Sequence, residues 1–314
     1  MPANWSFQEP VVPVLAFETD ELSEVLQFAQ RCFNSNVPVA LVTLVEIRGG
    51  AARSLGAHMA VAADGRYCGF VSGGCTESAV AAEAIEALHS NNDRFLKLGE
   101  GSPFFDIVLP CGGGINLSIH IIRDASPIQA VIESLLARRP ASLIYSPNRQ
   151  AIRFVGQNIG RIGWNEGEFV TVYEPRTRIL FCGRSIELTS CLRAATALGF
   201  DAFVIDKSSD LSALAFQIDE FTAVAFLLHD LDRELPVMQS ALRSKAFYIG
   251  ALGSVRTHEK RLAALHSAGF GPEDTARIKA PIGIFGKARD AVSIALSVLA
   301  DIAATKTALR NNAA

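Results

Sequence analysis

The second half of the sequence constrains the fold most, because short apolar runs alternate there with segments of helical periodicity. Such alternation predicts a parallel sheet covered by helices, as in a Rossmann-like domain. The expected strands lie at 179–182, 202–206, 223–228 and 247–249, with helices ending near Leu198 and Ser244 and a long terminal helix over 288–309.

The first half predicts a mixed α/β domain. A helix is expected over 20–33, with Asp20 as its cap, because apolar residues recur there at helical spacing. Further helices are expected over 76–89 and 126–139. Strands are expected at 38–47, 58–62, 104–109 and 115–122 and around Leu143, Phe154 and Val170, with a hairpin turn at 63–66. The predicted organisation is therefore an N-terminal domain over 1–173, a linker over 174–177 and a Rossmann-like domain over 178–314.

Composition excludes several classes of protein. The 314 residues suffice for about two domains, and a hydrophobic content of 49% excludes a disordered chain. Residues 1–173 carry 12 basic and 17 acidic side chains (−5) and the remainder carries 17 and 15 (+2), so neither part has the basic balance of a nucleic-acid binder. Six cysteines form no CxxC pair and are expected to be thiols. No apolar run approaches about 20 residues, and no basic segment precedes the apolar patch at 11–17, so we expect a cytoplasmic protein with no membrane segment.

A glycine–cysteine corner at Ser72–Gly73–Gly74–Cys75–Thr76–Glu77 opens the expected helix over 76–89. Glycines let a ligand approach the backbone closely, and free amides at a helix start attract anions. The same position lowers the pKa of a thiol and favours thiolate. The alternative is a tight turn with a buried, inert cysteine.

A second corner at Cys111–Gly112–Gly113 repeats this chemistry in the same domain. Together the two corners suggest a cleft for a flat, anionic ligand, with Cys75 and Cys111 as soft sulfur ligands for a metal. Arg48 and Arg53 flank Gly49–Gly50 and are candidates to clamp a phosphate, although lone arginines are more often solvated. His58, inside an expected strand, is expected to be structural.

The second domain offers candidates for nucleotide binding. Gly183 follows a strand and precedes a helix, but Ser185 stands where the second glycine of a dinucleotide fingerprint would be. Asp206 ends the next strand, at the position that binds ribose, and His229 follows the strand over 223–228. Gly253 and Ser254 precede another helix in the same way. Loop and capping chemistry is the alternative for these residues.

These motifs together resemble the XdhC/CoxI family, the accessory factors of xanthine dehydrogenase and related molybdenum hydroxylases such as carbon monoxide dehydrogenase. The resemblance is carried, in order, by 48–59, 72–77, 111–113, 228–230, 248–254, 256–257 and 281–283. It implies an N-terminal α/β domain followed by a Rossmann-like domain.

The resemblance also implies a function. A member would bind the molybdenum cofactor, as molybdopterin or its dinucleotide form, support its sulfuration with a cysteine desulfurase, and deliver it to an apo molybdenum hydroxylase. We therefore expect a maturation factor rather than an enzyme. Apolar surface on the two-domain body makes a homodimer a further expectation. The expected cofactor-binding residues are Arg48, Arg53, Ser72, Gly73, Gly74, Cys75, Glu77, Cys111, Gly112, Gly113, Gly183, Asp206, His229, Gly253 and Ser254.

Two alternative functions stay open. The chain could be an NAD(P)-dependent oxidoreductase that uses Asp206 for ribose and His229 as acid or base. It could also be an adapter that joins a desulfurase to a client without binding cofactor.

Overall fold

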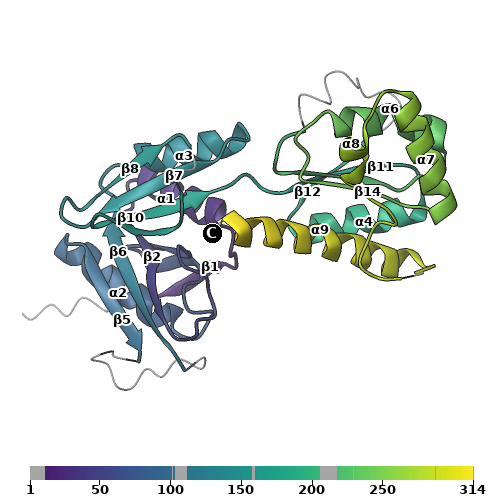
Figure 1. Cartoon of the computed structure of the whole chain (residues 1–314). Helices are drawn as coiled ribbons and strands as arrows, with labels where there is room; N and C mark the ends of the chain where they lie inside the picture. The colour runs from purple at the N-terminus through teal and green to yellow at the C-terminus, as the bar shows by residue number, and fades with distance from the viewer. Residues whose placement is uncertain are drawn as a thin grey trace, which may run out of the picture. The chain divides into compact units, whose positions relative to one another are not determined.

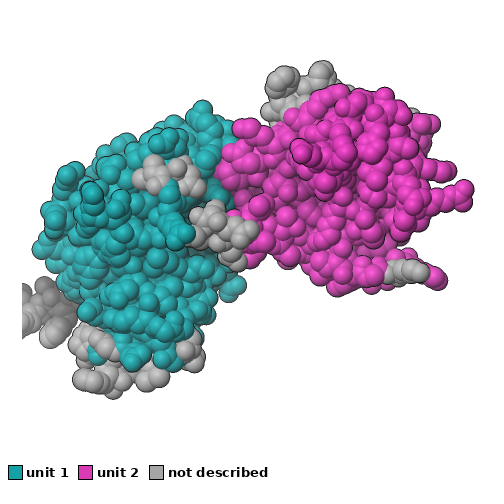
Figure 2. Space-filling view, viewed as in Figure 1, with its two compact units in different colours: residues 1–174 teal, residues 175–314 magenta. Residues whose placement is uncertain are grey.

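The computed structural model describes residues 11–100, 102, 112–157, 160–205, 218–228, 230–286 and 288–313. Of residues 311–313 it describes the backbone alone. The chain divides into two compact units, Met1–Glu174 (unit 1) and Pro175–Ala314 (unit 2), which are coloured separately in Figure 2. The predicted strand over 104–109 lies outside the described residues.

Unit 1 contains two sheets (Figure 1). The larger has the order β1-β4-β3-β2-β6-β5, in which β1 and β4 are parallel and the other neighbours antiparallel. Its strands are β1 (Val14–Phe17), β2 (Val39–Arg48), β3 (His58–Ala62), β4 (Arg66–Gly69), β5 (Arg94–Gly99) and β6 (Gly114–Ile121). The smaller, antiparallel sheet has the order β8-β7-β10-β9, from β7 (Ala141–Ser146), β8 (Ala151–Val155), β9 (Gly163–Asn165) and β10 (Glu168–Tyr173).

The central strand β2 explains how the layers of unit 1 are held together. Because successive side chains on a strand point to opposite faces, Val42 and Leu44 pack with α2 (Glu77–Ser90) on one face. Val39 and Leu41 pack on the other face with α1 (Leu22–Asn34) and α3 (Ser126–Leu136). A strand with both faces covered requires a continuous apolar run, and this run is what predicts β2 from the sequence.

Unit 2 is the predicted parallel α/β domain. Its sheet has the order β12-β11-β13-β14-β15, with every neighbouring pair parallel. The strands are β11 (Arg178–Cys182), β12 (Asp201–Ile205), β13 (Thr222–Phe226), β14 (Tyr248–Ala251) and β15 (Ile278–Lys279). The direction of strand addition reverses between β11 and β13, which places the ligand crevice of such folds beside the ends of these two strands.

Helices cover both faces of the unit 2 sheet. One face packs against α4 (Ile186–Ala197) and α9 (Ala291–Ala313), and the other against α6 (Leu231–Leu242) and α7 (Val255–Ser267). The short α8 (Pro272–Ala276) precedes β15.

Residues 291–310 of α9 are long and apolar enough to cross a membrane by length and composition, which corrects the expectation that no segment reaches this size. A core helix passes the same test, and Val298, Leu299 and Ile302 lie in the core of unit 2.

Candidate functional site

The loop that follows β2 brings the two glycine corners of unit 1 together. A methyl group added to Gly113 would lie 2.6 Å from the carbonyl oxygen of Arg48 and closer still to that of Gly50. One added to Gly73 would lie 2.8 Å from Cβ of Ala52. Residues 48–52 therefore contact both corners, and side chains at Gly73 and Gly113 would push them apart. Cys111, the second predicted thiol, lies outside the described residues.

The first corner is shaped by the buried carboxylate of Glu77. Its Oε1 accepts hydrogen bonds from the amides of Val71 (3.1 Å) and Ser72 (2.8 Å), and its Oε2 accepts from Oγ of Ser72 (2.8 Å) and the amide of Thr76 (3.1 Å). Ser72 and Glu77, predicted as cofactor contacts, thus use these polar atoms to fix the loop. The carboxylate at the start of α2 also offsets the positive end of the helix, so this corner relies on close backbone approach more than on attraction of a free anion.

Cys75 is the exposed thiol of the described chain. Gly73 (φ 92°) and Gly74 (φ 102°) adopt left-handed backbone conformations just before it, and no atom lies within 4 Å of the place that a side chain on Gly74 would take. The thiol therefore projects from a corner whose backbone stays accessible. The other described cysteines, Cys32, Cys68, Cys182 and Cys191, are buried, and burial raises the pKa of each thiol. The pKa is raised to about 12 for Cys68 and for Cys191.

The two candidate arginines differ in their surroundings. The guanidinium of Arg48 lies against Gly114, its cross-strand partner on β6, and its Nε and Nη2 are buried without a hydrogen-bond partner in the described chain. Arg53 forms an ion pair with Asp20 at 3.1 Å. This pairing corrects the prediction that Asp20 caps the first helix, because Glu21 takes the cap position and Asp20 turns to the arginine.

An open hollow of about 390 Å³ lies beside the first corner and is lined by Glu18, Thr19, Asp20, Arg53, Phe70 and Gly73. The hollow is lined by two carboxylates, Glu18 and Asp20, and by one guanidinium, that of Arg53, so its charge does not favour a phosphate. Its apolar wall, Phe70, and the backbone at Gly73 suit a flat ring instead.

The predicted residues of unit 2 have internal roles. A methyl group on Gly183 would lie 2.7 Å from the carbonyl oxygen of Leu227, so this glycine allows β11 and β13 to pack closely at their ends. Oγ of Ser254 accepts a hydrogen bond from the amide of Thr257 (3.3 Å) and caps α7, with Gly253 beside it. Asp206 and His229 lie outside the described residues.

His58 is structural, as predicted. It is 3% exposed, its Nδ1 lies 3.0 Å from Oγ1 of Thr43, and its Nε2 lies 2.5 Å from the hydroxyl of Tyr173. Within the residues that the structure describes, no group of three or more His, Cys, Asp or Glu side chains is placed to hold a metal ion. A metal contact through Cys75 and Cys111 stays a prediction.

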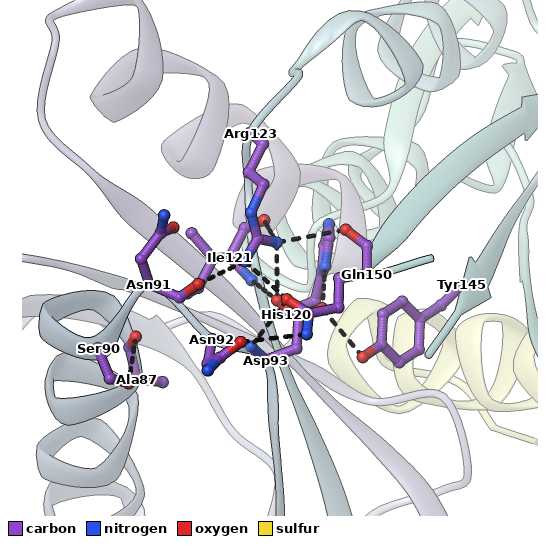
Figure 3. A network of polar contacts seen from close by, with 10 residues as sticks. All are labelled: Ala87, Ser90, Asn91, Asn92, Asp93, His120, Ile121, Arg123, Tyr145 and Gln150. Atoms are coloured by element: carbon purple, nitrogen blue, oxygen red, sulfur yellow. Dashed lines mark hydrogen bonds and ion pairs between the residues drawn. The ribbon is translucent and has the colours of Figure 1, made fainter. Parts of the chain in front are cut away.

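A buried polar network, not anticipated from the sequence, joins the two sheets of unit 1 (Figure 3). Asp93, at the turn before β5, accepts hydrogen bonds from the amide of Ile121 (3.1 Å), from Arg123 (2.9 Å) and from the hydroxyl of Tyr145 (3.0 Å), and its Oδ2 lies 2.6 Å from Nδ1 of His120. Burial alone would raise the pKa of Asp93, but the contacts with His120, Arg123 and Ile121 outweigh it and lower the pKa. The only sequence signal is an acidic residue in a polar turn, which does not reveal partners 27 to 52 residues away.

Comparisons with known proteins agree with this architecture. Residues 32–99 match the XdhC and CoxI family, and residues 179–302 match the XdhC Rossmann domain. The chain is 50% identical over 294 residues to the molybdenum cofactor insertion chaperone PaoD of Escherichia coli, covering 94% of this chain and 92% of that protein.

Two more distant proteins match most of the chain. A probable xanthine dehydrogenase subunit of Bacillus subtilis is 22% identical, covering 85% of this chain and 92% of that protein. The crystal structure of a xanthine dehydrogenase from Bacillus halodurans has a TM-score of 0.69 and 17% identity, over 90% of this chain and 96% of that chain, and supports the fold alone. With both family domains present and half of its residues identical to PaoD, the chain belongs to the XdhC and CoxI family.

Proposed function

We propose that this chain is a molybdenum cofactor insertion chaperone. It binds the cofactor as cargo, in its molybdopterin or dinucleotide form, and holds it while a cysteine desulfurase supplies the terminal sulfur. It then delivers the cofactor to an apo molybdenum hydroxylase of the xanthine dehydrogenase or carbon monoxide dehydrogenase type. The observation that carries the proposal is the 50% identity, over 94% of the chain, to a protein named as a chaperone of this kind.

The geometry of unit 1 supports a site for such a cargo. A flat pterin needs backbone that it can approach closely, and the hollow beside Gly73 and Phe70 offers this. Molybdenum and its terminal sulfur suit a soft ligand, and Cys75 is an exposed thiol at the same corner. The unpartnered nitrogens of Arg48, next to Gly114, suit an anionic oxygen of the cargo.

The residues have different roles in this proposal. Cys75 contacts the metal end of the cargo, with Cys111 as its partner thiol, and Arg48 and Arg53 bind its polar groups. Gly73, Gly74 and Gly112 keep the backbone accessible, and Gly113 lets the second corner pack against residues 48–50. Ser72 and Glu77 act through the loop that they fix, because their hydrogen bonds are already made inside the protein.

Cofactor retention is the direct test. Purified chain would be mixed with molybdenum cofactor released from a donor enzyme, and bound and free cofactor would be separated by gel filtration. The pterin is then quantified as its fluorescent oxidation product. We expect stoichiometric pterin on the wild type and at least about a tenfold loss of affinity for Cys75→Ser, which corresponds to about 1.4 kcal/mol.

A matched control is Ala82→Ser, an exposed substitution on the same helix, α2, which should retain cofactor like the wild type. Absence of pterin on the wild type would contradict the proposal. Full retention by Cys75→Ser, together with unchanged activation of the apo hydroxylase, would remove the thiol from the site.

A further inference from the structure

Exposed apolar side chains gather where the strands of unit 2 end. We use the name "carboxyl edge" for the segments 183–186, 253–256, 281–286 and 289–296, which follow β11, β14 and β15 and open α9. The amide of Ile282 donates to the carbonyl of Ala251 (3.0 Å) and ties the third segment to the end of β14. The exposed apolar residues of this edge are Ile186 (72%), Val255 (70%), Ile284 (53%), Phe285 (48%), Val292 (65%) and Leu296 (55%).

The helices that begin at this edge are capped by their own side chains. Ser185 caps α4 through the amide of Leu188 (3.2 Å), and Asp230 caps α6 through that of Arg233 (3.4 Å). Ser254 caps α7, and Oδ1 of Asp290 accepts from the amide of Ser293 (2.8 Å) at the start of α9. A capping side chain stands where an anion would bind, and two of these caps are carboxylates, so the edge does not favour a phosphate at these helix starts.

Arginines accompany the apolar residues. Arg184, Arg256 and Arg289 are exposed and have no hydrogen-bond or ion-pair partner among the residues described. The carboxylates of Asp230 and Asp290 are engaged in caps, which leaves Asp232 as an exposed acid of α6. The described edge segments therefore hold three arginines against one carboxylate, that of Asp290, and their net charge is positive. Apolar surface bordered by arginines is typical of protein interfaces, whose cores are enriched in aromatic residues and arginine.

We propose that the carboxyl edge of unit 2 is the surface on which the chain docks its client protein, and that the client presents carboxylates around an apolar patch. The inference rests on the proposed function, which supplies the client. A second copy of this chain fits less well, because a two-fold interface pairs a surface with itself and would bring the unpaired arginines together.

Binding of apo client to the cofactor-free chain tests this directly. The probe is an apo molybdenum hydroxylase, purified from cells that cannot make the cofactor, whose activity depends on this chain. Its Kd would be measured by calorimetry at low salt and at about 0.15 M salt, where screening of exposed charges is strong. We expect Arg184→Glu combined with Arg256→Glu to weaken binding at least about tenfold at low salt and to remove the gain in affinity that low salt gives the wild type. Phe285→Ser should weaken binding by a similar factor without changing the salt dependence.

Matched controls lie away from the edge. Arg193→Glu and Leu198→Ser change exposed residues toward the carboxyl end of α4, and both should bind client like the wild type. Circular dichroism would confirm that each variant is folded.

Several outcomes would overturn the proposal. These are unchanged client affinity in both edge variants, equal loss in the controls, or no binding by the wild type. Loss of cofactor retention with intact client binding would assign the edge to the cofactor instead. If the wild type binds client but no pterin, the proposed function fails while the docking surface stands, so the two failures are distinguishable.

Discussion

His58 is held neutral by its position inside unit 1. Burial lowers its pKa from 6.5 to about 4. The unfolded chain therefore takes up a proton at this ring more readily than the folded chain does. The free energy of unfolding is not reduced by this titration above pH 6.5, and it falls as the pH is lowered from 6.5 toward 4. At pH 5 the loss is about 2 kcal/mol, since one pKa unit corresponds to about 1.36 kcal/mol.

The expected result is a pH-dependent difference between the wild type and His58→Asn. The free energy of unfolding, measured in urea at pH 7 and pH 5, should fall by about 2 kcal/mol more in the wild type, because the variant has no titrating ring. His89→Asn, at an exposed position on α2, should keep the wild-type dependence. Parallel pH profiles of the wild type and His58→Asn would show that His58 does not titrate with folding.

Glu77 is predicted to control how Cys75 is presented. Glu77→Gln keeps the size of the side chain but replaces an acceptor oxygen by an NH₂ group, which cannot accept from the donors around it. We expect a loss of about 1–3 kcal/mol in the free energy of unfolding, because buried donors are left unsatisfied. The thiol of Cys75 should also react faster with an aromatic disulfide reagent, since the loop is loosened.

Glu86→Gln is the matched control on the same helix, because Glu86 is 64% exposed and pairs only with His89 at 3.8 Å in the described chain. Its unfolding free energy and thiol reactivity should equal those of the wild type. Equal effects of the two substitutions would mean that Glu77 has no special role in the corner.

Hydrophobic periodicity predicts the helices and strands that bury a clear apolar face. The expected strand over 58–62 coincides with β3, and the expected helix over 76–89 differs from α2 by one residue at each end. β1 and β5 were not predicted. In β5 only Leu96 and Leu98 are buried while Phe95 is exposed, so its alternation is short and includes an outward-facing aromatic residue.

The Asp93 network connects the larger sheet of unit 1 to the smaller one. It joins the turn before β5 to β6 through His120 and to β7 through Tyr145. Asp93→Asn removes the charge and leaves Arg123 and His120 around a neutral amide (Figure 3). We expect a loss of about 2–3 kcal/mol in the free energy of unfolding, near the value for hydrogen bonds to charged groups, because Arg123 is partly exposed and its share is screened.

Asp64→Asn provides the comparison. Asp64 pairs with Arg66 at 2.6 Å, but its side chain is 42% exposed, so the loss should stay below about 1 kcal/mol. Urea unfolding of both variants at pH 7 measures the two values. Similar losses would show that the network is no more important to unit 1 than a surface pair.

The candidate site is harder to predict from the sequence than the fold is. Sequence patterns identify each glycine corner, because glycine and cysteine recur at strand and helix ends. They do not show that residues 48–52 contact both corners, or that Glu77 is internal, because those contacts depend on sheet register and loop closure. The cap at Asp20 was wrong for the same reason: its partner Arg53 is 33 residues away.

The two units divide the proposed tasks. Every hydrophobic cluster of the described chain draws its buried residues from one unit, three clusters from unit 1 and two from unit 2. Each unit therefore has a core of its own, and each is large enough to fold alone. Expressed separately, residues 1–174 and residues 175–314 should each unfold cooperatively in a calorimeter.

The binding of cofactor and the binding of client should likewise belong to different units. Residues 1–174 contain the glycine corners and Cys75, so they should retain molybdenum cofactor without binding the apo hydroxylase. Residues 175–314 contain the carboxyl edge, so they should bind the apo hydroxylase without pterin. Gel filtration with pterin fluorescence measures the first, and calorimetry with the apo hydroxylase measures the second. If residues 175–314 retained pterin by themselves, the cargo site would lie in unit 2. The assignment of the cargo to the glycine corners and Cys75 would then be wrong.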